Sequence, residues 1–268
     1  MDLEEPFLTS EPVVLAKTDA NTASYSGRGI IEVLDVIKIL EDAGIACCVT
    51  GAHALLYYGA KLVPVDWEVC VPNEDFKKAS AMFTSNPLSD IYEPWTKILP
   101  QVRSLIHTYP RFTLKGVNFF FFIVPAFEYN IKWESSDLEK SQLGIPFPKL
   151  ELLARSLLDT QRQLELTNLV DGMDLSEEWG EEHLDLDRTG ELEYAGEKNK
   201  RLIASHCGSR EIPIPKLSEV PKDLRQQWQN IVRGKQRRIN LELPKHLYST
   251  RFRMVGSGDP RLRAGRNI

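Results

Sequence analysis

The sequence predicts a mixed α/β fold, in which a sheet of about four or five strands flanked by helices precedes a mostly helical C-terminal part. Two observations predict it. Helical and strand-like apolar patterns alternate over residues 30–125, and apolar helical patterns dominate from residue 147 onward. Residues 117–124 are apolar at nearly every position, which is typical of a central strand in a sheet covered on both faces.

The first elements alternate helix and strand. Apolar residues recur at helical spacing over residues 30–43, and Gly44 follows as the expected left-handed C-cap. Residues 45–50 form a short apolar run flanked by glycines, which predicts a buried strand. A short helix is expected over residues 51–58, and a further strand over residues 65–71.

The next segment predicts a helix and a hairpin. Asn73 is placed to cap a helix that runs through Phe83. Residues 102–107 are a candidate strand within a proline-rich region. Residues 112–114 and 117–124 are separated by Lys-Gly, which favours a β-hairpin.

The C-terminal half predicts two helices, over residues 147–169 and 222–232. We therefore expect a loose lead-in (1–25), a sheet domain (26–145), a helical and acidic part (146–207) and a basic C-terminal segment (208–268).

Composition excludes several protein classes. With 268 residues, 42% of them hydrophobic, the chain is long enough to bury a substantial core. It has no run of 18 apolar residues and no signal-peptide pattern at its acidic start, so we expect no membrane span and a cytoplasmic location, with a nuclear one left open. Its four cysteines are too irregularly spaced for a disulfide framework.

The C-terminal segment is basic, whereas the rest of the chain is acidic. From residue 216 onward the net charge is +9, whereas residues 1–215 carry −14. Residues 165–197 hold 12 acidic residues and a single basic one. We expect the basic C-terminal segment to pack against this acidic region; nucleic-acid binding is the less favoured alternative.

Two carboxylates mark the candidate site. On a strand, Asp66 and Glu68 project from one face, while Val65, Trp67 and Val69 point to the other. Mg²⁺ commonly binds through one or two carboxylates together with substrate phosphates. Gly51 opens a helix directly after a strand, and this leaves backbone N–H groups free for a phosphate.

The segment CVTGAHALLYYGAKLVPVDWEVCV (48–71) resembles the nucleotidyltransferase superfamily, in particular the branch of abortive-infection enzymes and aminoglycoside nucleotidyltransferases. Members of that branch carry a strand, a glycine pair opening a helix, a further glycine, and a strand with Asp-x-Asp. Gly51-Ala52, Gly59 and Asp66-Trp-Glu68 stand at the matching positions. The resemblance covers roughly residues 30–170, with residues 26–145 as its nucleotidyltransferase-like domain.

This resemblance implies an Mg²⁺-dependent transferase that moves a nucleoside monophosphate from a nucleoside triphosphate to the hydroxyl of an unidentified acceptor. It implies that Asp66 and Glu68 are the catalytic residues and metal ligands, with Asn118 as a further metal ligand. The residues expected to bind the nucleotide are Gly51, Ala52, His53 and Lys61.

Three alternatives stay open. The superfamily supplies a third carboxylate from a later central strand, where this chain offers only Asn118, so it is also interpreted as a catalytically degenerate binding or regulatory protein. Glu128 or Asp171 would restore the enzyme interpretation if either converged on Asp66 and Glu68. In a second alternative, Asp66 and Glu68 form a solvated strand face. In a third, the chain is a structural partner of another protein.

Overall fold

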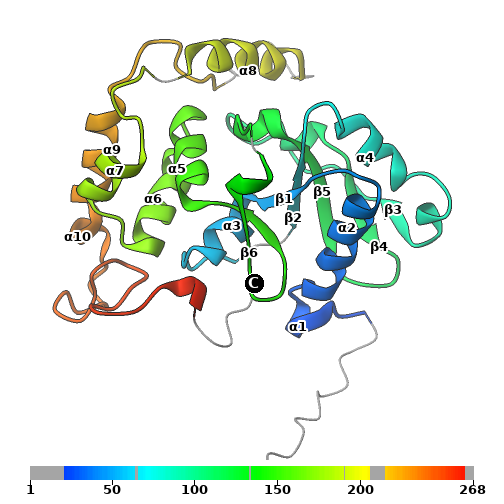
Figure 1. Cartoon of the computed structure of the whole chain (residues 1–268), viewed down its shortest axis with the longest axis horizontal. Helices are drawn as coiled ribbons and strands as arrows, with labels where there is room; N and C mark the ends of the chain where they lie inside the picture. Colours follow the sequence, from blue (N-terminus) through cyan, green and yellow to red (C-terminus); the bar gives the residue numbers. More distant parts are fainter. Residues whose placement is uncertain (1–20, 64–65, 133, 190, 206–214, 263–268) are drawn as a thin grey trace, which may run out of the picture.

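The computed structural model describes residues 21–63, 66–132, 134–189, 191–205 and 215–262, and it confirms the mixed α/β architecture (Figure 1). A five-stranded sheet has the order β1-β2-β5-β4-β3. Its strands are β1 (Cys48–Thr50), β2 (Trp67–Val71), β3 (Tyr92–Pro94), β4 (Arg111–Leu114) and β5 (Phe120–Pro125). A separate two-stranded sheet pairs β6 (Leu138–Lys140) with β7 (Pro146–Pro148).

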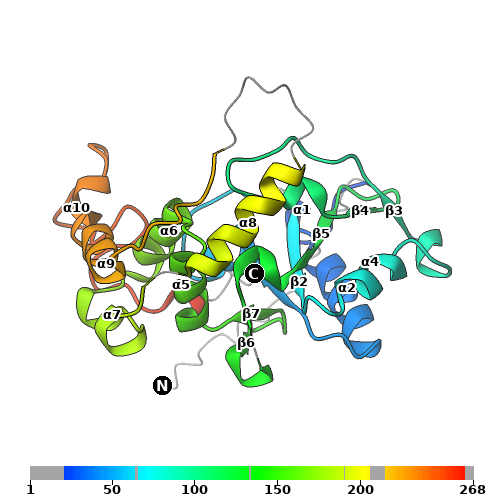
Figure 2. The ribbon, with the colours of Figure 1, turned by 90° about the horizontal axis from the view of Figure 1, so that it is seen from above.

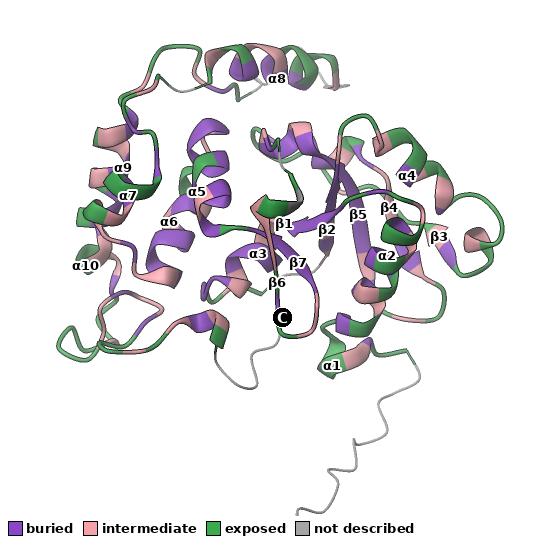
Figure 3. Ribbon diagram, viewed as in Figure 1, coloured by how far each residue is buried: buried purple, intermediate pink, exposed green. Residues whose placement is uncertain are grey.

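The central position of β5 agrees with its apolar sequence. It runs parallel to β2 and antiparallel to β4, with which it forms the predicted hairpin. Phe121 and Phe122 point to opposite faces, and both are almost fully buried. In Figure 3 the strands β2 and β5 are buried along nearly their whole length, as expected for a sheet covered on both sides.

Three helices follow the predicted order in the sheet domain. They are α2 (Ile30–Asp42), α3 (Gly51–Tyr57) and α4 (Phe76–Met82), and a short turn of helix, α1 (Ser24–Gly27), precedes them. Gly44 follows α2 with φ +75°, which confirms the predicted C-cap. The prediction that Asn73 caps α4 is wrong. The helix begins three residues later, and the Asn73 side chain accepts a hydrogen bond from the Phe127 N–H instead.

The region between α4 and β4 differs from the prediction. The candidate strand over residues 102–107 is a turn that leads into a 3₁₀ helix, η2 (Ile106–Thr108). β4 pairs with β5 on one side and with β3 on the other, and the sequence analysis did not predict β3. β3 is only three residues long and ends in a proline, so its own pattern is too short to be recognised.

The helical part lies beside the β1 edge of the sheet (Figure 1). Its helices are α5 (Leu150–Asp159), α6 (Gln163–Met173), α7 (Glu177–His183), α8 (Leu192–Ser205), α9 (Leu224–Arg233) and α10 (Lys235–Arg238). The single helix predicted over residues 147–169 is therefore wrong. Gln161 has a positive φ of +55°, which separates α5 from α6 and lets them pack against each other.

The predicted contact between the basic C-terminal segment and the acidic region is confirmed. Arg225, Arg233, Lys235 and Arg238 form ion pairs with carboxylates of residues 171–187. Among the described residues, no helix is long and apolar enough to cross a membrane. Most of the lead-in, residues 1–20, lies outside the described residues, as do residues 206–214 and 263–268.

Candidate functional site

The acid pair lies at the start of β2. Asp66 immediately precedes the strand and Glu68 is its second residue, so both project from one face. Trp67 and Val69 point to the opposite face and are buried, as predicted; Val65 lies outside the described residues.

Glu68 lies directly against the turn that opens α3. Gly51 has φ +63°, and a Cβ atom at this position would overlap the Glu68 carboxylate. Glu68 therefore faces the Gly51 turn. However, the carboxylate itself fills the space that a bound phosphate was expected to approach.

A tyrosine holds the Glu68 side chain. The Tyr129 hydroxyl donates a hydrogen bond of 2.5 Å to Glu68 Oε2. Tyr129 belongs to the 3₁₀ helix η3 (Ala126–Tyr129), and its ring packs 4.5 Å below the Arg162 guanidinium. Burial raises the pKa of Glu68 above its ordinary value, although the Tyr129 hydrogen bond and Arg162 lower it. Its environment therefore disfavours the charged carboxylate that a metal ion requires.

Asp66 pairs with an arginine that the sequence analysis missed. Arg111 Nη2 lies 2.9 Å from Asp66 Oδ1, and the two side chains are only 12% and 14% exposed. Arg111 Nη1 donates to the Thr96 carbonyl, and its guanidinium lies 4.7 Å from the centre of the Phe120 ring. Arg111 stands alone between proline and phenylalanine in the sequence, so only the pairing of β4 with β5 brings it to this face.

The strand register explains why no third carboxylate joins the pair. Glu68 lies opposite Phe122 of β5, and Phe122 lies opposite Arg111 of β4. An aromatic ring therefore stands beside Glu68, with a guanidinium beyond it. Asn118 precedes β5 in the hairpin loop, where it is exposed and its backbone N–H donates to Asn21.

These side chains do not fit Mg²⁺ as they are arranged. One oxygen of each acid is already bonded, to Arg111 and to Tyr129 respectively. Within the described part of the chain, no three histidine, cysteine or acidic side chains cluster as metal ligands. The metal site that the resemblance implies therefore stays a prediction.

The two carboxylates proposed as possible replacements have other partners. Glu128 is fully buried and accepts hydrogen bonds from Ser104 and Tyr109, and it pairs with Arg162 and Lys198. Asp171 is equally buried but lies in α6, where the C-terminal segment pairs with it. Neither supplies a free third oxygen donor next to Asp66.

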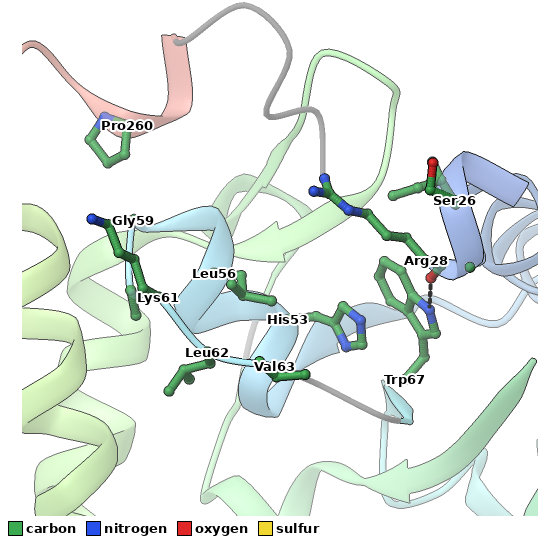
Figure 4. Close-up of a pocket in the computed structure, with 13 residues that line it drawn as sticks. Ser26, Arg28, His53, Leu56, Gly59, Lys61, Leu62, Val63, Trp67 and Pro260 are labelled. Carbon is green, nitrogen blue, oxygen red and sulfur yellow. Dashed lines mark hydrogen bonds between the residues drawn. The ribbon is translucent and has the colours of Figure 1, made fainter. Parts of the chain in front are cut away.

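Two of the other residues predicted to bind nucleotide, His53 and Lys61, lie on the opposite side of β2. His53 stacks on Trp67 with ring centres 3.6 Å apart, and both side chains are almost fully buried. Lys61 is exposed in the segment that follows α3. His53, Lys61 and Trp67 line a cavity of about 470 Å³ (Figure 4), whose lining does not include Asp66 or Glu68. The predicted site is therefore divided between two faces of the sheet.

The sequence was also compared with known proteins. No model of a protein family matches the chain, and no curated protein matches it either.

Proposed function

We propose that the chain is a binding protein with a nucleotidyltransferase-like sheet domain whose acid pair has a structural role, rather than a metal-dependent transferase. The observation that carries this proposal is the ion pair between Asp66 and Arg111. A cation supplied by the protein neutralises the carboxylate that the transferase mechanism needs for Mg²⁺.

Energetics supports this assignment. Arg111 is held by Asp66, by the Thr96 carbonyl and by the Phe120 ring, so its removal would break several contacts at once. A dication at Asp66 would either displace this guanidinium or approach it closely, and like charges repel strongly in a partly buried site. Glu68 is a poor second ligand because one of its oxygens already accepts the Tyr129 hydrogen bond.

Calorimetric titration of the full chain tests the proposal, with each of the four nucleoside triphosphates in the presence and absence of Mg²⁺. We expect no Mg²⁺-dependent binding at concentrations up to about 1 mM, because no described site neutralises the triphosphate and the metal together. The Asp66→Asn variant should give the same isotherms. Pyrophosphate release should stay at the background rate of a protein-free control.

The second candidate is the Mg²⁺-dependent nucleotidyltransferase, which is favoured by the placement of Asp66 and Glu68 on one face beside Gly51. In this candidate Arg111 must leave Asp66 when metal and nucleotide bind. Mg²⁺-dependent binding that Asp66→Asn abolishes, and that Lys38→Gln on the far surface of α2 leaves intact, would overturn the first proposal in favour of this one.

A further inference from the structure

The cavity on the opposite face of β2 has the features of a separate ligand site. It lies between the start of α2, the helix α3 and the 3₁₀ helix η5 (Pro260–Leu262). Its volume of about 470 Å³ is sufficient for a small organic molecule. Because its lining excludes Asp66 and Glu68, a ligand in this cavity would be independent of the proposed role of the acid pair.

A buried polar atom without a partner is the first indication of a ligand. His53 is only 4% exposed, and its Nδ1 has no hydrogen-bond partner in the described structure. An unsatisfied buried nitrogen is unfavourable, and in the neutral tautomer that carries the ring proton on Nδ1 this atom would donate a hydrogen bond to an anionic head in the cavity. Burial lowers the pKa of His53 to about 3, so the ring is neutral at physiological pH.

Two cations at the rim give the second indication. Arg28 and Lys61 both line the cavity and are exposed, and no described acidic side chain forms an ion pair with either. Figure 4 shows the Arg28 side chain extending over the cavity above the stacked rings of His53 and Trp67. The Trp67 indole N–H donates to the Arg28 carbonyl, which fixes the backbone from which this arginine projects.

The remaining wall is apolar. Leu56 and Leu62 line it together with the edges of the stacked His53 and Trp67 rings, which are themselves almost fully buried. Val63, also in the lining, is 95% exposed. The geometry points to a small organic anion with an apolar body as the ligand, its charged head bound by Arg28 and attracted by Lys61 from the other side of the rim, and its body lying against Leu56, Leu62 and Val63.

Calorimetry on the full chain with 2-naphthoate as the probe tests this inference, with neutral 2-naphthalenemethanol as its matched control. We expect 2-naphthoate to bind with a Kd below about 1 mM, and the alcohol to bind about tenfold more weakly, because only the anion forms charge-assisted hydrogen bonds. A parallel titration with 2-naphthyl phosphate distinguishes a carboxylate site from a phosphate site by which anion binds more tightly.

Substitutions of the two rim residues test whether their side chains bind the anionic group of the ligand. Arg28→Gln and Lys61→Gln should each weaken 2-naphthoate binding by about fivefold or more and leave the alcohol unaffected. Lys77→Gln, an exposed lysine of α4 outside the cavity, should change neither. Both rim residues are exposed, so their substitution should leave the fold intact, as thermal unfolding would verify.

Three results would overturn the inference: no binding of 2-naphthoate at about 1 mM, equal affinities for the acid and the alcohol, or unchanged binding in both rim variants. His53→Phe provides a further check, because it keeps the stack on Trp67 but removes the ring nitrogens. A folded His53→Phe variant that binds 2-naphthoate as tightly as the unaltered protein would exclude His53 from the site.

Discussion

Asp66 and Arg111 illustrate how burial determines the contribution of a single ion pair. Because each side chain is less than 15% exposed, neither group is well solvated if the other is removed. We expect Asp66→Asn and Arg111→Gln each to lower the free energy of unfolding by about 1.5–3 kcal/mol, the range for a hydrogen bond to a charged group. Urea unfolding measures both, and the double variant should lose less than their sum.

The pair between Lys38 and Asp42 is the matched control, because both side chains are more than 60% exposed. Lys38→Gln should leave the urea unfolding midpoint unchanged. If Asp66→Asn leaves the midpoint unchanged as well, or if the double variant is exactly additive, then Asp66 and Arg111 are not energetically coupled.

Asp159, at the end of α5, predicts a pH dependence. Burial raises its pKa to about 6, although Arg188 pairs with it at 2.5 Å and lowers the value. A carboxyl group whose pKa is higher in the folded than in the unfolded state contributes stability at pH values below its unfolded-state pKa of about 4. This contribution is lost as the pH rises through the folded-state pKa of about 6. The unfolding free energy of the protein, relative to that of Asp159→Asn, should therefore fall by about 2–3 kcal/mol between pH 4 and pH 7. A constant difference across this range would contradict the raised pKa.

At the scale of secondary-structure elements, the spacing of apolar residues correctly predicted those features that depend only on residues close together in the sequence. The helix α2 with its glycine cap and the hairpin of β4 and β5 follow from apolar spacing and turn residues. The face shared by Asp66 and Glu68 follows from strand geometry alone. Arg111 could not be predicted as their neighbour, because its position depends on the order of strands in the sheet. The break at Gln161 lies within a continuous helical pattern, so tertiary packing outweighs local preference there.

The helix α8 is attached to the sheet domain through Glu128. Lys198 is completely buried, lies 3.0 Å from the Glu128 carboxylate and also donates to the Glu128 carbonyl. The Tyr194 hydroxyl donates to the same carbonyl. Seen from above in Figure 2, α8 crosses the molecule between α5 and β5. These contacts fix α8 to η3, and so to the element that positions Tyr129.

Removing this attachment should destabilise the protein strongly. Lys198→Met leaves the buried Glu128 carboxylate without its closest ammonium partner, so we expect a loss of about 3 kcal/mol or more in the free energy of unfolding. Hydrogen exchange should show lower protection of α8 than in the unaltered protein. Glu197→Gln, which breaks an exposed pair with Arg201 on the same helix, should have no measurable effect on either. Equal effects of the two substitutions would mean that Glu128 does not anchor the helix.

Over the whole molecule, opposite charges join the C-terminal segment to the acidic region of residues 171–187. The acidic helices α6 and α7 meet the basic segment that contains α9 and α10. Apolar contacts support the same arrangement, since Trp228 is fully buried against Trp179 and Gly180. Arg225, Arg233, Lys235 and Arg238 are thus committed to intramolecular partners, which agrees with the preference for that interpretation over nucleic-acid binding.

Two ion pairs in this contact have the same geometry but different burial. Arg238 bonds both oxygens of Asp171, which is completely buried, at 2.8 and 2.6 Å. Arg233 bonds both oxygens of Glu177, whose side chain is 30% exposed, at 2.8 and 2.7 Å. Comparing them therefore tests the combined effect of burial and of a second arginine, because Arg251 also pairs with Asp171.

We expect Asp171→Asn to lower the free energy of unfolding by about 3 kcal/mol, because it leaves Arg238 and Arg251 without the carboxylate between them. Glu177→Gln should cost much less, because water replaces the lost bonds at a partly exposed site. In about 1 M NaCl, where the screening length falls to roughly 3 Å, the small effect of Glu177→Gln should disappear while most of the Asp171→Asn effect remains. Urea unfolding of both variants at low and high salt measures all four values. If salt abolished the Asp171 effect as well, the contact would be a surface attraction rather than a buried connection between α6 and the C-terminal segment.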